Sequence, residues 1–231
     1  MKENIYTIPI NDAFSSDCEC PLCQFKSGEE KNRIEYALGA SMMEPDERIA
    51  SNEQGYCQRH TQMMYNFGNK LSHALVLETR LKYITAEIEK YQPKKMKKLF
   101  ARCDASGKFS NSETCIVCSR LDVIMENFIS NLFYLYKKDE DFKKKFFDCK
   151  GFCLPHFELL LNSAPKYLSG DVLTDFFQKT CELQKSNLER VTEDIVWFTK
   201  KFDYRYKDED WKNSKDAVNR ACLKISGYIE E

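Results

Sequence analysis

The sequence predicts an all-α protein: a helical bundle built from two degenerate repeats, each with a Cys3His zinc site, plus a C-terminal helix. Three observations indicate this fold class. Glycine and proline are scarce, with 8 and 6 copies in 231 residues. Apolar residues recur at alternating intervals of three and four, which places them on one face of a helix. Two cysteine motifs also occur twice, with the copies 95 or 96 positions apart.

The clearest helices are predicted in the second half of the chain. One carries the apolar stripe Leu121, Met125, Phe128, Leu132 and Leu135. A longer helix is predicted from about residue 171 to about residue 202, with the stripe Leu188, Val191, Ile195, Phe198 and Phe202. Stripes of this kind are typical of packing faces in a helical bundle.

The first half contains a comparable but shorter helical pattern, formed by Leu71, Leu75, Leu81, Ile84 and Ile88. Only the opening IYTIPI (5–10) has the composition of an extended segment. Pro9 restricts that segment to an edge strand, because proline lacks the N–H group that a central strand needs.

These patterns divide the chain into four predicted segments. Residues 1–92 form the first repeat, and residues 93–112 form a basic and polar linker. Residues 113–203 form the second repeat with its long helix, and residues 204–231 form the C-terminal helical segment. The linker starts with PKKMKKLFAR and continues into a stretch rich in Ser, Asn, Asp and Gly, as is typical of a solvated connection.

The duplicated motifs are a CxxC pair and a Gly-aromatic-Cys-x-x-His hexapeptide. The CxxC copies are CPLC (20–23) and CIVC (115–118), and the hexapeptides are GYCQRH (55–60) and GFCLPH (151–156). In each half, CxxC precedes a predicted helix and the hexapeptide opens another one. Four spacings that agree within one residue indicate duplication of an ancestral half.

Each half therefore offers three thiols and one imidazole, a donor set that satisfies tetrahedral zinc. The predicted ligands are Cys20, Cys23, Cys57 and His60 in the first half, and Cys115, Cys118, Cys153 and His156 in the second. Two ions per chain are expected. Four protein ligands close the coordination shell, whereas catalytic zinc keeps a position for water or substrate, so structural zinc is favoured.

The local chemistry of the hexapeptides supports this interpretation. Pro155 suits an early helical position, where its missing N–H group costs nothing. Unpaired N–H groups at a helix start favour a thiolate. The glycine before each aromatic residue is expected to adopt a backbone conformation that other residues resist.

Three alternatives remain open at the level of sequence. The CxxC of one half can meet the CxxH of the other, and the spacing does not distinguish the two pairings. An iron–sulfur cluster is a less favoured metal centre, because thiolate-rich sites hold either metal. Reduced, buried thiols without metal are the third, although they leave the repetition in register unexplained.

The other cysteines and the third histidine are not duplicated, so none is a first-choice ligand. Cys18 has Glu113 as its counterpart, and His73 has Ser169. Cys181 and Cys222 are expected to be small packing residues. His73 is expected on a helix face or in a hydrogen-bonded core position.

Composition and missing motifs exclude or disfavour several function classes. Lys and Arg total 35 against 36 for Asp and Glu, a balance that disfavours nucleic acid as a partner. No secretion signal and no membrane-spanning segment is predicted, so a cytoplasmic location is expected. Nucleotide-binding, nucleophile-elbow and HExxH motifs are missing, so an enzyme is less expected than a non-enzyme.

The motifs CPLC with GYCQRH, CIVC with GFCLPH, and the tail FDYRYKDEDWKNSKDAVNRACLKISG (202–227) resemble an uncharacterised bacterial family known only as a domain of unknown function. The resemblance extends over most of the chain. It implies a cytoplasmic bacterial protein and no established activity.

The leading functional hypothesis is a non-enzymatic binding or regulatory module with structural zinc, acting on an unknown protein or small-molecule partner. A competing hypothesis is a thiol-based redox or metal sensor, in which Cys18 and the CxxC thiols respond to oxidation or zinc loss. A weaker one is a metal-dependent enzyme with an incompletely filled site.

Overall fold

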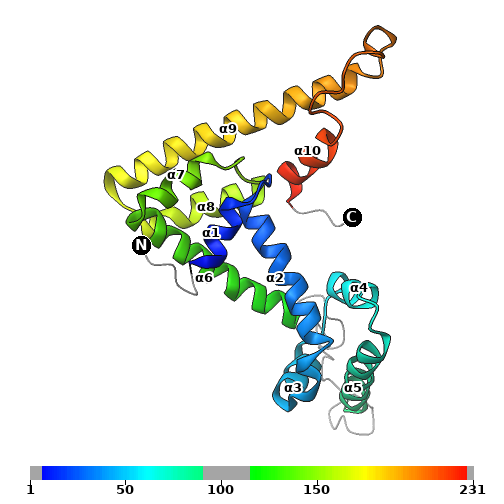
Figure 1. The fold of residues 1–231 in the computed structure, drawn as a ribbon. Helices are drawn as coiled ribbons and strands as arrows, with labels where there is room; N and C mark the ends of the chain where they lie inside the picture. Colours follow the sequence, from blue (N-terminus) through cyan, green and yellow to red (C-terminus); the bar gives the residue numbers. More distant parts are fainter. Residues whose placement is uncertain (1–6, 91–114, 228–231) are drawn as a thin grey trace, which may run out of the picture. The chain divides into compact units, whose positions relative to one another are not determined.

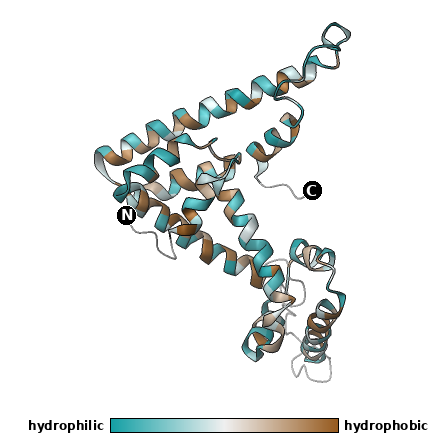
Figure 2. Cartoon of the chain, in the orientation of Figure 1, coloured by the Kyte–Doolittle hydropathy of each residue, from teal (hydrophilic) through white to brown (hydrophobic). Residues whose placement is uncertain are grey.

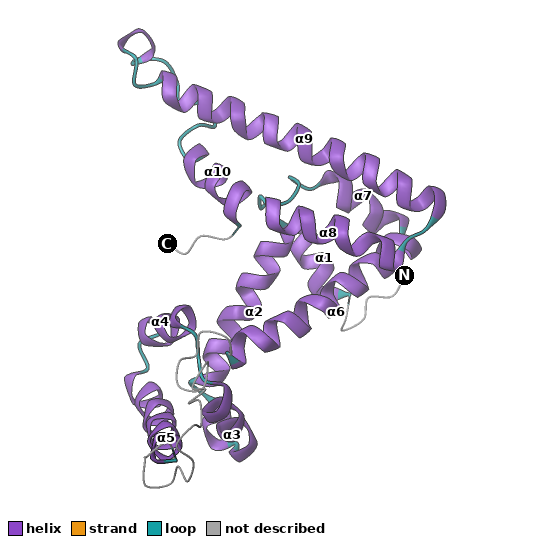
Figure 3. Cartoon of the chain, turned by 180° about the vertical axis from the view of Figure 1, so that it is seen from behind, coloured by secondary structure: helices purple, strands orange, loops and turns teal. Residues whose placement is uncertain are grey.

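The computed structural model describes residues 7–90 and 115–227 (Figure 1). The described residues form ten α-helices and contain no strand (Figure 3), which confirms the all-α class. The first five helices are α1 (Ile8–Ser15), α2 (Pro21–Ala37), α3 (Pro45–Gln54), α4 (Gln58–Asn66) and α5 (Lys70–Glu89). The others are α6 (Ile116–Lys138), α7 (Glu140–Asp148), α8 (Leu154–Tyr167), α9 (Gly170–Lys200) and α10 (Ala217–Ser226). Short 3₁₀ turns are η1 (Ala40–Met43) and η3 (Tyr204–Tyr206). The predicted linker, residues 93–112, lies outside the described residues.

The helices are grouped into two compact units. Unit 1 comprises Met1–Ser27 and Met125–Glu231, and unit 2 comprises Gly28–Ile124. The boundary therefore falls inside α2 and again inside α6. Unit 1 is discontinuous in sequence, an arrangement that consecutive repeats at 1–92 and 113–203 do not anticipate. The duplication of an ancestral half stays a prediction.

Unit 1 has the larger core, with twenty-one buried residues in one apolar cluster. Aromatic rings dominate it: Phe146 lies with ring centroids 5.4 Å from Phe152 and 5.7 Å from Phe176. The later part of the α6 stripe, from Met125 to Leu135, is buried in this core as predicted. Helix α9 confirms the predicted long helix, and hydrophobic and hydrophilic residues alternate along it (Figure 2).

Unit 2 has a smaller core of nine buried residues, to which α2, α4, α5 and α6 contribute. The predicted helix in this part of the chain is confirmed as α5, but its apolar stripe faces largely outward: Leu71 is 73% exposed and Leu81 is 62% exposed. The buried face of α5 carries Ser72, His73, Val76 and Arg80 instead. One charged group of this face is satisfied by the backbone, because Arg80 donates to the carbonyl of Asn52.

The opening segment corrects one expectation. The predicted extended segment at 5–10 is helical from Ile8 onward, and Pro9 occupies the first turn of α1. Proline suits that position because the first N–H groups of a helix have no intrahelical partner, and its φ angle is already helical. Residues 5 and 6 lie outside the described part of the chain.

Within the described residues, no helix combines the length and the apolar character needed to cross a membrane.

Candidate metal centres

All four cysteine motifs stand at the starts of helices. Cys57 and Cys153 are the N-cap residues of α4 and α8, and Cys20 and Cys115 directly precede α2 and α6. The glycines of the hexapeptides have positive φ angles, 69° at Gly55 and 78° at Gly151, as predicted from their position. Each motif therefore presents its sulfur atoms beside N–H groups that lack intrahelical partners.

The structure brings all eight predicted ligands into two clusters. Cluster 1 consists of Cys20, Cys23, Cys153 and His156 in unit 1. Cluster 2 consists of Cys57, His60, Cys115 and Cys118 in unit 2. The donor atoms of each cluster all lie within 4.8 Å of one another. No other described cysteine, and not His73, joins either set.

The grouping corrects the expectation that each half holds its own site, because each cluster combines the CxxC of one half with the CxxH of the other. The length of α2 supplies the physical reason. With 17 residues and about 1.5 Å per residue, α2 separates its two ends by roughly 25 Å. Cys20 and Cys23 lie at its start in unit 1, whereas its end lies in unit 2, the unit that also contains Cys57 and His60.

Distances in cluster 1 are those of donors arranged around one point. His156 Nδ1 lies 3.5 Å from Cys20 Sγ, 3.3 Å from Cys23 Sγ and 3.2 Å from Cys153 Sγ. The Sγ atoms of Cys23 and Cys153 are 3.5 Å apart.

Cluster 2 repeats this geometry. His60 Nδ1 lies 3.1 Å from Cys57 Sγ, 3.2 Å from Cys115 Sγ and 3.4 Å from Cys118 Sγ. The Sγ atoms of Cys57 and Cys118 are 3.9 Å apart. Metal–sulfur bonds of about 2.3 Å and metal–nitrogen bonds of about 2.0 Å give tetrahedral edges of about 3.5 to 3.8 Å. Each cluster therefore fits a tetrahedral ion of its own.

In cluster 2, a buried carboxylate orients the histidine. His60 Nε2 lies 2.9 Å from Glu30 Oε1, and Arg59 also contacts Glu30, with Nη2 2.7 Å from Oε2. Burial raises the pKa of Glu30, but the hydrogen bonds from His60 and Arg59 outweigh burial and hold that pKa at about 2. Glu30 is therefore ionised at neutral pH, which directs Nδ1 of His60 toward the thiols.

Replacing this carboxylate is expected to weaken metal binding at cluster 2. Glu30→Gln keeps the shape but removes the charge, so we expect a 10- to 100-fold loss of affinity, the usual effect of removing such a partner. Competition against a chelator of known affinity measures the change. Glu35→Gln, at an exposed position on α2, is the matched control and should leave the affinity unchanged. Equal affinities for Glu30→Gln and the unmodified protein would contradict the role given to Glu30.

In cluster 1, the loops that lead to the cysteine motifs are held by a buried lysine from α10. Lys224 is 1% exposed, and its Nζ donates to the carbonyl of Glu19 at 2.6 Å and to the carbonyl of Lys150. It also lies 3.1 Å from the Glu19 carboxylate, which pairs with Arg190 at 2.6 Å. Lys224 thus joins the residue before Cys20 to the residue before the GFCLPH hexapeptide.

Two further contacts close cluster 1. Gln184 of α9 accepts from the N–H of Phe152 and donates to its carbonyl, both at 2.9 Å. Gly227, at the end of α10, comes so close that an added Cβ would lie 3.7 Å from Cys153 Sγ and 3.8 Å from Cys23 Sγ. The C-terminal helix therefore covers cluster 1.

Sequence reasoning missed Glu30, Gln184 and Lys224, because none of them belongs to a duplicated motif. The 95-residue offset places Met125 opposite Glu30, so comparing the two halves does not reveal the carboxylate either. Of the remaining residues considered, Cys18 is half-buried and burial raises its pKa. His73 is buried, and its Nε2 has no hydrogen-bond partner among the described residues.

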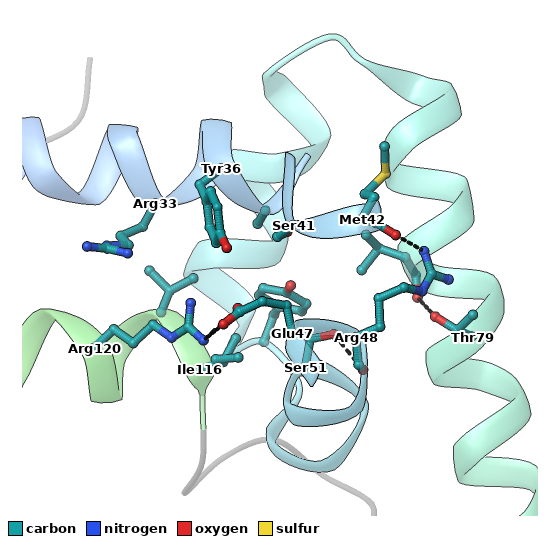
Figure 4. Close-up of a pocket in the computed structure, with 14 residues that line it drawn as sticks. Arg33, Tyr36, Ser41, Met42, Glu47, Arg48, Ser51, Thr79, Ile116 and Arg120 are labelled. Carbon is teal, nitrogen blue, oxygen red and sulfur yellow. Dashed lines mark hydrogen bonds and ion pairs between the residues drawn. The ribbon is translucent and has the colours of Figure 1, made fainter. Parts of the chain in front are cut away.

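A small pocket in unit 2 lies among α2, η1, α3, α5 and the start of α6 (Figure 4). Its volume of about 20 Å³ holds about one water molecule. Most of the charged groups around it pair with one another or with backbone: Arg120 contacts Glu47 at 2.6 Å, and Arg48 donates to the Met42 carbonyl at 3.2 Å. These contacts therefore join α3 to α6 and to η1.

Comparison with known proteins adds a family but no activity. A family model described as "Family of unknown function (DUF6062)" matches residues 1–231. No curated protein and no solved structure matches the chain. The resemblance to a family of unknown function is confirmed, and the function must be argued from the two clusters.

Proposed function

Since the chain belongs to DUF6062, a family of unknown function, we propose its function from the clusters: it is a zinc protein that holds two structural ions and serves as a non-enzymatic binding or regulatory module. The observation that carries this proposal is the pair of closed Cys3His donor sets, in each of which the donor atoms lie within 4.8 Å of one another. A cytoplasmic location belongs to the same proposal, because reduced thiols are needed to bind the ions.

The donor chemistry and geometry favour zinc over an iron–sulfur cluster. In an iron–sulfur cluster the protein ligands are divided among two or more iron atoms, so ligands on different irons stand farther apart than the edges of a single tetrahedron. Donor atoms within 4.8 Å of one another suit a single ion. Three sulfurs and one nitrogen around a tetrahedral centre are typical of structural zinc.

The arrangement also indicates what the ions do. Each ion would join the start of one CxxC helix to the start of one CxxH helix: α2 to α8 in cluster 1, and α6 to α4 in cluster 2. Each ion would then hold together two segments that lie more than fifty residues apart in the sequence. A set of four protein ligands leaves no position for a substrate, which supports a structural role.

Elemental analysis of protein purified under reducing conditions without added metal tests the proposal. We expect about two zinc ions per chain, as two closed four-ligand sites require. Iron in place of zinc would redirect the proposal toward redox chemistry. Protein that contains no metal and takes up none from a zinc buffer would overturn it.

A further inference from the structure

The two clusters differ in how far their sulfur atoms are shielded from solvent. All four residues of cluster 1 are buried. In cluster 2, His60 and Cys115 are buried, but Cys57 and Cys118 are only half-buried. The rate at which a thiolate reacts depends strongly on access, so the two sites should differ in reactivity even though their donor sets are the same.

The surroundings of the clusters explain this difference. Cluster 1 is covered by α10, through Gly227 and the buried Lys224. Beside cluster 2 lies an open groove of about 910 Å³, lined by residues of α4 and α5 and by Cys57 itself. A groove of this volume has room for small solutes beside Cys57.

The two half-buried sulfurs of cluster 2 are also neighbours. Cys57 Sγ and Cys118 Sγ are 3.9 Å apart, and they come from separate helix starts. A disulfide needs a separation of about 2.05 Å, so closing the gap takes a movement of roughly 2 Å. Loss of the ion between them would permit that movement.

We infer that cluster 2 is a peroxide-sensitive site, in which Cys57 and Cys118 form a disulfide and the ion is released, while cluster 1 keeps its ion. The inference rests on the proposed zinc binding and assigns regulation to one of the two sites. The first step is attack of the Cys57 thiolate on one oxygen of hydrogen peroxide. The O–O bond breaks, leaving a sulfenic acid on Cys57 and a hydroxide ion.

In the second step, the Cys118 thiolate attacks the Cys57 sulfur, an S–S bond forms and a second hydroxide leaves. The two thiolates lose two electrons, and peroxide gains them; two protons from solvent convert the hydroxides to water. Cluster 2 then retains only His60 and Cys115 as donors. Because the core of unit 2 has nine buried residues against twenty-one in unit 1, loss of this site loosens unit 2. A thiol reductant with zinc restores the site.

The experiment uses the full chain with Cys18, Cys103, Cys149, Cys181 and Cys222 replaced by serine, so that the six cysteines of the two clusters are the only thiols left. After zinc loading, the metal content is measured, peroxide is added, and released zinc is followed with a chromogenic chelator. Peptide mass mapping then identifies the disulfide. We expect one of two ions to be released ~10-fold faster than the other, with a Cys57–Cys118 disulfide.

A groove-filling variant provides the matched test of access. Thr61 lines the groove, so Thr61→Trp should slow the release of zinc several-fold without changing the metal content. Asn66→Trp, at an exposed position on the same helix that does not line the groove, is the control and should release zinc at the original rate.

The outcomes separate this inference from the proposed function. If the chain binds no zinc before peroxide is added, the proposed function is wrong. A chain that binds two ions but releases both at the same rate, or neither, overturns the inference alone. A disulfide within cluster 1, or one that joins Cys115 to Cys118, also overturns it.

Discussion

Removing metal from the reduced protein with a strong chelator is expected to unfold unit 2 while much of unit 1 stays helical. Unit 2 buries nine residues in its apolar cluster, and two of its helices, α4 and α6, start at cluster 2. Structural zinc supplies about 10–16 kcal/mol of apparent binding free energy in zinc-finger peptides. That is comparable with the roughly 5–15 kcal/mol of net stability of a typical domain. The small core alone should not hold unit 2 together.

Residue-resolved hydrogen exchange, with and without chelator, measures this effect. Amides of α3, α4 and α5 should lose most of their protection, whereas amides of α6 after Met125, α8 and α9 should keep part of theirs. Re-adding zinc to the reduced protein should restore the original pattern, which separates metal loss from irreversible damage. Uniform loss of protection in both units, or no loss in unit 2, would contradict the unequal dependence on metal.

Replacing Lys224 by methionine is the second change with a large expected effect. The substitution keeps most of the volume but removes a buried ammonium that holds the carbonyls of Glu19 and Lys150. Leaving one partner of a buried charge pair alone costs about 3–5 kcal/mol. We expect about 3 kcal/mol here, the lower end of that range, because Arg190 still neutralises Glu19.

Denaturant unfolding of the zinc-loaded protein measures this loss, and chelator competition shows whether cluster 1 binds its ion more weakly. Both should change, because Lys224 joins the two loops that carry the cluster 1 ligands. Lys215→Met, at an exposed position shortly before α10, is the control and should change neither quantity. A stable Lys224→Met protein with unchanged metal affinity would show that α10 does not hold these loops.

The residues that make up the two clusters were accessible from the sequence because the motifs are duplicated in register. Repetition separated these eight candidate ligands from Cys18, Cys181 and His73, and the clusters contain the same eight residues. The backbone geometry at the hexapeptides was accessible too, because a glycine at that place indicates a conformation that other residues resist; the positive φ angles of Gly55 and Gly151 are examples.

The pairing of the motifs was not accessible, because the spacings within and between halves are compatible with both arrangements. What decides it is where the chain goes after each CxxC, and α2 leads it from unit 1 into unit 2. Sequence periodicity likewise marks a helix without saying which face is buried. Helix α5 exposes Leu81 and buries Arg80, and α10 exposes Ile225 and buries Lys224.

The crossed pairing is the central claim, and the metal content of two double variants tests it most directly. Cys20→Ser with Cys153→Ser removes two ligands from cluster 1 alone, so about one zinc ion per chain should remain. Cys20→Ser with Cys57→Ser removes one ligand from each cluster, so tightly bound zinc should be lost from both. If each half instead held its own ion, the results would be reversed: the second variant would keep one ion and the first would keep none.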